Sequence, residues 1–294
     1  MEGKEAEADL SPANPLMQLI VQPDDGVTPL IEAVKAAERR IDILIFRFDR
    51  PGLERAIEDA VDRGVVVRAL IAHTNRGGED RLRELELRLL QRGVTVSRTA
   101  DDLIRYHGKM MVVDDQLFVL GFNFTKLDIE KSRSFGLVTK SKTMLAEAAE
   151  LYEADSTRQP YGSACDDDFV VSPECSRVLL TRFIKSAEKQ LLIYDAKLSD
   201  RPILRLLQAK VKAGVEVRVI GKVGKGADLP SVRLKDRRLH VRAIVVDGRE
   251  VFIGSQSLRK LELDSRREIG VICRTATVAR RVAQIFELDW AKSS

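Results

Sequence analysis

Two of the chain's three histidines stand in the same local pattern in two distant parts of the sequence. His107 is followed two residues later by Lys109, and His240 is followed two residues later by Arg242. Residues two apart on a strand share a face, so each imidazole is expected beside a fixed positive charge. An imidazole can attack phosphorus or protonate a leaving alkoxide, and a cation can neutralise phosphate oxygens. These residues therefore indicate phosphodiester chemistry, which needs no metal and no cofactor.

The segments that contain these histidines align with each other without a gap. YHGKMMVVDDQLFVLGFN at 106–123 and LHVRAIVVDGREVFIGSQ at 239–256 each predict two strands around a polar turn. Asp114 and Asp247 stand at the two turns. Two roles are open for these carboxylates. They hold the imidazole tautomers, as carboxylates do beside other catalytic histidines, or they only shape the turns.

The similarity extends upstream and indicates an internal repeat. DRGVVVRALI at 62–71 matches KAGVEVRVIG at 212–221, and ERRIDILIF at 38–46 matches EKQLLIYDA at 188–196. Each pattern is typical of a helix end that leads into a buried strand. RLRELELRLLQRG at 81–93 predicts a helix without a counterpart in the second half. We expect two α/β sandwiches related by a pseudo-twofold axis, with both histidines facing one cleft so that a monomer suffices.

The segment boundaries follow from composition and from the extent of the repeat. The acidic residues 1–14 are predicted to be a disordered leader, and 15–158 form the first repeat. Residues 159–168, rich in Pro, Gly, Ser and Asp, are predicted to be a linker before the second repeat at 169–294.

The repeated motif resembles the signature of the phospholipase D superfamily. HGKMMVVD at 107–114 fits HxKxxxxD, and HVRAIVVD at 240–247 is the same motif with Arg for Lys. Each is followed after six residues by a glycine, and GSQS at 254–257 is similar to the family's GSxN. The resemblance implies two tandem α/β/α sandwich repeats and a metal-independent phosphodiesterase or phosphatidyltransferase without cofactors.

The resemblance also implies a covalent phosphohistidine. His107 is assigned as nucleophile, because its motif is the intact one, and His240 as the general acid and then base; the two could be exchanged. Residues expected to bind substrate are Asn123, Ser255, Ser257 and Glu268.

The sequence departs from the family pattern at several places. Arg242 is bulkier than the usual Lys, GFN at 121–123 lacks the usual serine, and Ser257 stands where the family has Asn. Glu268 matches a glutamate of the family, whereas the first half has Ser134. A degenerate, noncatalytic binding protein is therefore an alternative.

Composition limits the setting of this chemistry. The 294 residues are 44% hydrophobic and 32% charged, which excludes a disordered chain and supports a sizeable core. Apolar runs are far shorter than a membrane span requires, so no span is expected. Three cysteines are too few for a disulfide framework and show no zinc-ligand spacing. These features favour a reducing, cytoplasmic location.

The substrate class remains open between lipid and nucleic acid. Net charge is about −5 over residues 1–160 and about +9 over 161–294, with a dense basic cluster at 233–242. That cluster could gather phosphates of either substrate or be a solvated face. Aromatic content of 5% offers few platforms for base stacking. A phospholipid is favoured, with peripheral membrane contact, and a nuclease acting on DNA or RNA is the alternative.

Overall fold

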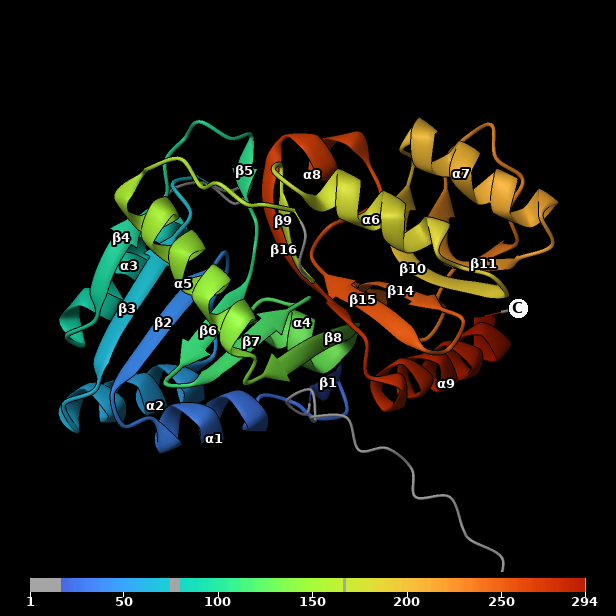
Figure 1. Ribbon diagram of the computed structural model, residues 1–294. Helices are drawn as coiled ribbons and strands as arrows, with labels where there is room; N and C mark the ends of the chain where they lie inside the picture. Colours follow the sequence, from blue (N-terminus) through green and yellow to red (C-terminus); the bar gives the residue numbers. More distant parts are fainter. Residues whose placement is uncertain (1–16, 75–79, 166–167, 294) are drawn as a thin grey trace, which may run out of the picture.

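The chain folds into two α/β sandwiches that lie side by side (Figure 1). The computed structural model describes residues 17–74, 80–165 and 168–293. The leader predicted at 1–14 lies outside the described residues, as do residues 166 and 167 of the predicted linker.

Each half alternates helices and strands before it ends in a hairpin, a long strand and a helix. The first half contains, in chain order, β1 (Gln18–Gln22), α1 (Thr28–Ala36), β2 (Arg40–Ile45), α2 (Pro51–Asp62), β3 (Val66–Ile71), α3 (Asp80–Gln91), β4 (Thr95–Arg98), β5 (Arg105–Tyr106), β6 (Met110–Val113), β7 (Gln116–Leu120), α4 (Lys126–Lys131), β8 (Ser132–Thr139) and α5 (Lys142–Thr157). The second half contains β9 (Phe169–Ser172), α6 (Ser176–Lys185), β10 (Gln190–Leu198), α7 (Arg201–Lys212), β11 (Glu216–Val223), β12 (Ser231–Val232), β13 (Arg238–Leu239), β14 (Arg242–Val246), β15 (Glu250–Gly254), α8 (Lys260–Asp264), β16 (Arg266–Cys273) and α9 (Ala276–Ser293).

The two sheets have the same topology, which confirms the predicted repeat. The first has the order β1-β8-β7-β6-β2-β3-β4 and the second β12-β11-β10-β14-β15-β16, with β9 on the far side of β16. In each, a parallel pair joins an antiparallel hairpin, because the crossover helices α2 and α7 return the chain in the same direction. The predicted extra helix of the first half is α3, and between β11 and β13 there is no helix.

Two short strands are exchanged between the halves. β5 of the first half pairs with β16 of the second sheet, and β13 of the second half pairs with β8 of the first sheet. Both pairings are parallel. The exchange is reciprocal, as the predicted pseudo-twofold relation requires, and it joins the two sheets at one seam.

Buried ion pairs repeat the same reciprocity. Arg133 on β8 lies 2.8 Å from Asp289 on α9, while Arg267 on β16 lies 3.0 Å from Asp155 on α5. All four side chains are at least nine-tenths buried. Removing one partner of such a pair typically costs about 3–5 kcal/mol, because a buried charge is left uncompensated. The seam is therefore fixed by charge as well as by packing.

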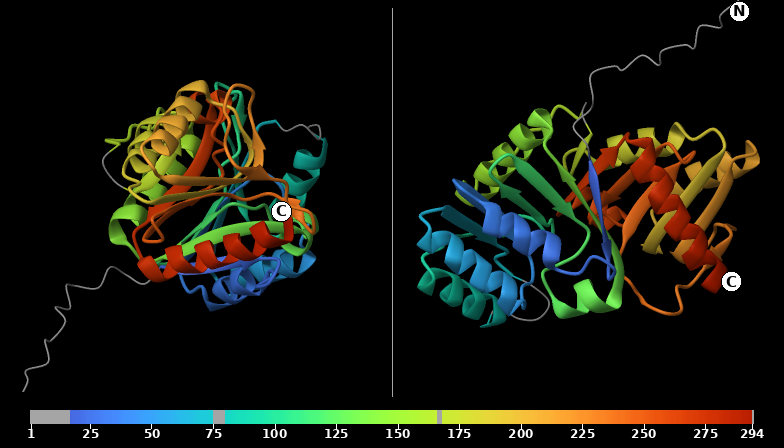
Figure 2. Two further views of the ribbon diagram at one scale, coloured as in Figure 1. Left: turned by 90° about the vertical axis from the view of Figure 1, so that its right-hand side faces the viewer. Right: turned by 90° about the horizontal axis from the view of Figure 1, so that it is seen from below.

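The apolar core is continuous across the seam. One cluster includes strands of both sheets together with α5 and α9, and within it Tyr194 packs edge-on against Phe135 and Phe286. Two further clusters lie under the other helices, beneath α1 and α2 in the first half and beneath α6 and α7 in the second. Figure 2 shows these helices on the outer faces of the two sandwiches. Both histidine motifs are thus built on rigid elements.

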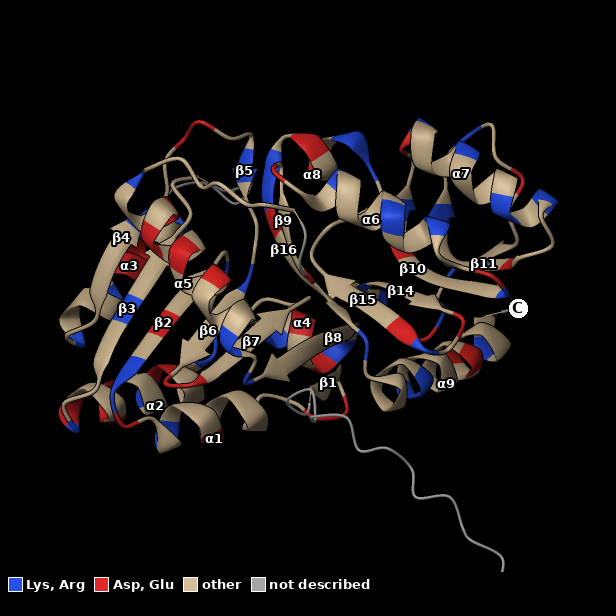
Figure 3. Cartoon of the chain, in the orientation of Figure 1, with Lys and Arg blue, Asp and Glu red and all other residues tan. Residues whose placement is uncertain are grey.

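Charge is distributed unevenly over this framework (Figure 3). The sequence of α5 contains four carboxylates and one Lys, whereas α7 contains four basic residues and no acidic one. None of the helices in the described parts combines the length and apolar content that a bilayer span requires.

The cysteines differ from the sequence expectation. Cys165 and Cys175 form a disulfide, and Cys273 is buried and unpaired. Sequence spacing alone does not bring the first two together. They meet because α6 begins just after Cys175 while the segment before β9 passes alongside it, with the Cα atoms 5.1 Å apart. This pair does not support the reducing compartment that the cysteine count favours, since disulfides are rare there.

Candidate active site

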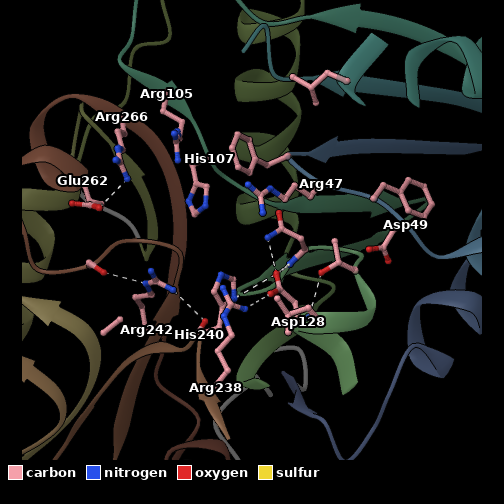
Figure 4. A pocket seen from close by; sticks show the side chains of 18 of the residues that line it. Arg47, Asp49, Arg105, His107, Asp128, Arg238, His240, Arg242, Glu262 and Arg266 are labelled. Carbon is pink, nitrogen blue, oxygen red and sulfur yellow. Dashed lines mark hydrogen bonds and ion pairs between the residues drawn. The ribbon is translucent and has the colours of Figure 1, made fainter. Parts of the chain in front are cut away.

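One pocket at the seam is lined by both repeated histidines (Figure 4). It has a volume of about 560 Å³. Residues of both sandwiches form its wall, and α3 contributes Leu82 and Leu85. Its basic lining residues outnumber the carboxylates Asp49, Asp128 and Glu262, and they are Arg47, Arg81, Arg105, Lys197, Arg238, Arg242, Arg259 and Arg266. A pocket with this excess of positive charge favours an anionic ligand.

The exchanged strands bring the histidines to this pocket. β5 ends directly before His107, whose backbone N–H donates to the carbonyl of Arg267, 2.7 Å away. β13 ends directly before His240, whose N–H donates to the carbonyl of Arg133, 3.2 Å away. Each imidazole therefore lies beside a strand of the opposite repeat, which explains why residues from both halves are needed to build the site.

Glu268 on β16 fixes the orientation of His107. Its Oε2 lies 2.9 Å from His107 Nδ1, and the carboxylate is fully buried. Burial lowers the pKa of His107 to about 4. Glu268 acts to raise this pKa, and the positive charge of Lys109 acts to lower it further. The imidazole is therefore neutral near pH 7. Because Nδ1 faces Glu268, we assign the proton to Nδ1, which leaves the lone pair on Nε2.

Each histidine has a cation against its own backbone carbonyl. Lys109 Nζ donates to the carbonyl of His107 at 2.6 Å and lies 3.2 Å from both ring nitrogens. Arg242 Nη1 donates to the carbonyl of His240 at 3.2 Å, and its Nε donates to Ser257 Oγ at 3.1 Å. Burial lowers the pKa of Lys109 to about 7. The Arg for Lys replacement keeps the position of the charge and adds the bond to Ser257.

His240 faces a carboxylate from a different place in the fold. Asp128 on α4 has its Oδ2 3.6 Å from His240 Nδ1, and both side chains are buried. Burial and the neighbouring Arg242 hold the pKa of His240 well below its usual value, although Asp128 acts in the opposite direction. Burial tends to raise the pKa of Asp128, but His240, Asn123 and Arg238 bring it to about 2.

The family pattern matches most of the chain. The family described as "Cardiolipin synthase, PLD-like domain" matches residues 30–156 and 180–290, which include both histidine motifs. The chain belongs to the phospholipase D superfamily. No curated protein matches it significantly by sequence.

Two solved structures resemble most of the chain. Polyphosphate kinase from Porphyromonas gingivalis matches with a TM-score of 0.76 at 19% identity, over 94% of this chain and 50% of the kinase. Phosphatidylserine synthase from Haemophilus influenzae Rd KW20 matches with a TM-score of 0.68 at 12% identity, over 92% of this chain and 84% of the synthase. The chain therefore spans half of the polyphosphate kinase. At these identities the likeness shows the two-repeat fold alone.

The aspartates of the two phospholipase D motifs do not reach the histidines. Asp114 accepts hydrogen bonds from the backbone N–H groups of residues 38–40, and Asp247 accepts them from those of residues 188–190. Both aspartates adopt a left-handed conformation, with φ of 49° and 52°. Seven residues of extended chain place them roughly 20 Å from their histidines. The structure thus supports turn formation, and holding the imidazole tautomers is not their role.

The remaining expected site residues divide between the pocket and its support. Asn123 and Ser257 line the pocket. Asn123 donates its backbone N–H and its Nδ2 to Asp128 Oδ2, at 3.0 and 2.7 Å. Ser255 is buried against the backbone of Ile269 and helps to lower the pKa of Glu268, so it supports a carboxylate and does not face substrate.

Sequence reasoning missed Asp128, although one signal was available. In the stretch before the last strand of each repeat, LDIEKSRSFG at 127–136 aligns with LELDSRREIG at 261–270, so Asp128 corresponds to Glu262. Acidic residues at equivalent positions near a motif are candidates for a shared site. Within the described residues, no group of three or more His, Cys, Asp and Glu is arranged to hold a metal ion.

Proposed function

We propose that the chain is a metal-independent phosphodiesterase of the phospholipase D type, which acts on the head-group side of a phospholipid through a phosphohistidine. The observation that carries this proposal is the pair of histidines in one cationic pocket, of which His107 is held by Glu268 of the opposite repeat. Hydrolysis and transfer use the same chemistry, because either water or an alcohol can accept the phosphoryl group.

In the first step, His107 is the nucleophile. Its Nε2 lone pair forms a bond to phosphorus while the bond from phosphorus to the leaving oxygen breaks. A pKa of about 4 keeps this imidazole neutral and able to attack. The Glu268 carboxylate, 2.9 Å from Nδ1, stabilises the positive charge that the ring acquires.

In the same step, His240 donates a proton to the leaving alkoxide. The neutral His240 then removes a proton from water or an alcohol, whose oxygen attacks phosphorus and breaks the bond to His107. Arg242 lowers the pKa of His240, and the negative charge of a bound diester opposes that effect. Substrate binding therefore favours the protonated acid.

Lys109, in its protonated form, and Arg242 supply positive charge for the transition state. Lys109 and Arg242 come from equivalent positions of the two motifs and lie beside their histidines. Arg242 lines the pocket and can neutralise a nonbridging oxygen directly, whereas Lys109 is buried beside His107 and adds positive charge without lining the pocket. Since their backbone contacts hold both side chains, little reorganisation is needed during the reaction.

A phospholipid is the substrate that we favour. Leu127 lines the pocket and is half exposed, which suits an apolar neighbour of the diester; the buried Leu82 and Leu85 line the same pocket. The phenyl rings of the lining offer no open face for a base. Phe46 packs against His107 and has the Arg47 and Arg105 guanidinium groups over it, and Phe48 packs against Phe124.

A nuclease is the second candidate. The excess of lining cations suits a polyanion as well as a lipid head group. Phosphate contacts release counterions, so nucleic-acid binding would weaken steeply with salt, and charge reversal at Arg237 and Arg238 would flatten that dependence. A binding protein without activity is the third reading, and it predicts no turnover of any diester.

The substrate proposal is tested by a side-by-side assay. Phosphatidylcholine vesicles, single-stranded DNA and bis(nitrophenyl) phosphate are each incubated with the protein in excess EDTA. We expect release of the lipid head group and nitrophenolate in the presence of chelator, and no cleavage of DNA. Cleavage of DNA alone would favour the nuclease, and activity that disappears with EDTA and returns with Mg²⁺ would contradict the mechanism.

The pH dependence provides a separate prediction. For the nitrophenyl diester, kcat/KM should rise as the pH increases through about 4, where His107 loses its proton, and fall through about 7, where Lys109 loses its charge. With an alkyl leaving group the fall should begin at lower pH, because His240 must be protonated and its pKa lies well below its usual value. Alkaline limbs at the same pH for both substrates would contradict the assignment of His240.

A further inference from the structure

The two histidines differ in the strand residue that lies beside them. The backbone of His107 pairs with Arg267, so the next residue, Glu268, reaches His107 Nδ1. The backbone of His240 pairs with Arg133, so the next residue is Ser134. The Ser134 hydroxyl donates a hydrogen bond to the carbonyl of His240, with the oxygen atoms 3.3 Å apart. It therefore provides no carboxylate for the imidazole. The first repeat thus has a serine, Ser134, at the position where the second repeat has the carboxylate of Glu268.

We propose that Asp128 takes the place of the missing acid and is the positioning residue of His240. The inference rests on the proposed function and assigns a role that the motif pattern does not contain. The carboxylate moves from the strand β8 to the short helix α4, six residues earlier in the chain.

The surroundings of Asp128 aim one oxygen at the imidazole. Oδ2 accepts the N–H and Nδ2 of Asn123 and faces His240 Nδ1 at 3.6 Å, while Oδ1 accepts from Arg238 Nη1. Within the described residues His240 Nδ1 has no hydrogen-bond partner, although nine-tenths of the side chain is buried. A movement of about 0.5 Å would give an ordinary hydrogen bond, and catalytic bonds commonly tighten when substrate binds.

The equivalent carboxylate of the second repeat is used differently. Glu262 on α8 pairs with Arg259 and with Arg266 Nη1, 2.9 Å away. In the first repeat the residues at these two positions are Thr125, whose hydroxyl accepts only the backbone N–H of Asp128, and Ser132, which donates to the carbonyl of Leu127, so neither supplies a charge to the Asp128 carboxylate. The carboxylate of α4 therefore contacts His240 as well as Arg238, while that of α8 pairs with two arginines and Glu268 contacts His107.

A carboxylate at this place favours the tautomer and the protonated form in which His240 can act as a general acid. By accepting a hydrogen bond from Nδ1–H it leaves Nε2 as the nitrogen that carries the transferable proton, and it stabilises the imidazolium. The cations that face His240 are Arg238 from β13, Arg242 from β14 and Lys109 from the first motif. Asp128 opposes all three, so without it His240 would be protonated only at lower pH.

Kinetics of Asp128→Asn test the proposal, with Glu130→Gln as the matched control. Glu130 lies on the same helix but pairs with Arg50 at the surface. We expect Asp128→Asn to lower kcat by about a hundredfold for an alkyl diester and by less than about threefold for nitrophenolate release from a nitrophenyl diester. The control should stay within about twofold for both. Equal losses on the two substrates, or no loss, would overturn the proposal.

A second-site change provides the rescue. Adding Ser134→Glu to Asp128→Asn returns a carboxylate to the position that Glu268 occupies in the other half. The double variant should have a kcat on the alkyl diester at least tenfold higher than that of Asp128→Asn alone. Ser134→Gln in the same background should not. If Asp128→Asn does not fold, Asp128→Glu keeps the charge for Arg238, and its defect should again be confined to the alkyl diester; equal defects would overturn the proposal.

Titration of His240 separates this inference from the proposed function. The pKa of its imidazole, followed by NMR without substrate, should fall in Asp128→Asn and stay unchanged in Glu130→Gln. That shift without any diester turnover would reject the proposed function and leave the Asp128–His240 pairing intact. An unchanged His240 pKa in the Asn variant would overturn the pairing.

Discussion

Replacing His107 by Ala is expected to abolish turnover of every diester, together with formation of the covalent intermediate. The imidazole supplies the atom that bonds to phosphorus, so a better leaving group cannot compensate for its loss. The loss should reach the detection limit for both alkyl and nitrophenyl substrates, as measured by product release and by phosphate label retained on the denatured protein.

The control for this experiment is the third histidine. His73 lies in the segment after β3 and does not line the pocket, so His73→Ala should retain activity and label. Retention of substantial nitrophenyl turnover by His107→Ala would contradict its assignment as nucleophile. Comparison of the thermal unfolding of both variants excludes a general loss of structure.

Replacing His240 by Ala should produce a defect of a different kind. Loss of a general acid lowers the rate by about a hundredfold to ten-thousandfold for an alkyl leaving group. Nitrophenolate needs little protonation, so the nitrophenyl diester should restore the first step. Because the base of the second step is also missing, the phosphoenzyme should accumulate, and a stoichiometric burst of nitrophenolate should precede a slow steady state. Equal defects for both leaving groups would contradict the acid role.

The hairpins could be predicted from sequence because the residues that determine each hairpin are close together in the chain. β6 with β7 and β14 with β15 have the apolar pattern of buried strands around polar turns, and the second copy confirms the register. The pairing of histidine and cation on one face follows from the two-residue period of a strand. The parallel strands and the extra helix α3 could be predicted for the same reason.

The exchanged strands could not be predicted in this way. β5 and β13 are two residues long, which is too short for any periodicity, and their partners lie in the opposite repeat. Their pairing depends on tertiary packing at the seam. The same limit explains why the role of Asp114 and Asp247 stayed open at the level of sequence, since a motif shows which residues occur together and does not show which of them touch.

The role of Asp128 depends on the same long-range geometry. Its distance from His240 along the chain is 112 residues, and α4 is a helix of only six residues. Ser134 read alone suggests a degenerate site, whereas the structure provides a carboxylate 3.6 Å from the imidazole. The departure from the family pattern therefore does not by itself indicate loss of activity.

Identification of the phosphorylated residue tests the central claim most directly. Labelled diester is mixed with the parent protein and with His240→Ala, the reaction is stopped by rapid denaturation at alkaline pH, at which a phosphorus–nitrogen bond survives, and the labelled peptide is sequenced by mass spectrometry. We predict label on His107 in both proteins, at higher occupancy in His240→Ala. Label on His240 of the parent, or turnover by the parent without label on any residue, would contradict the mechanism.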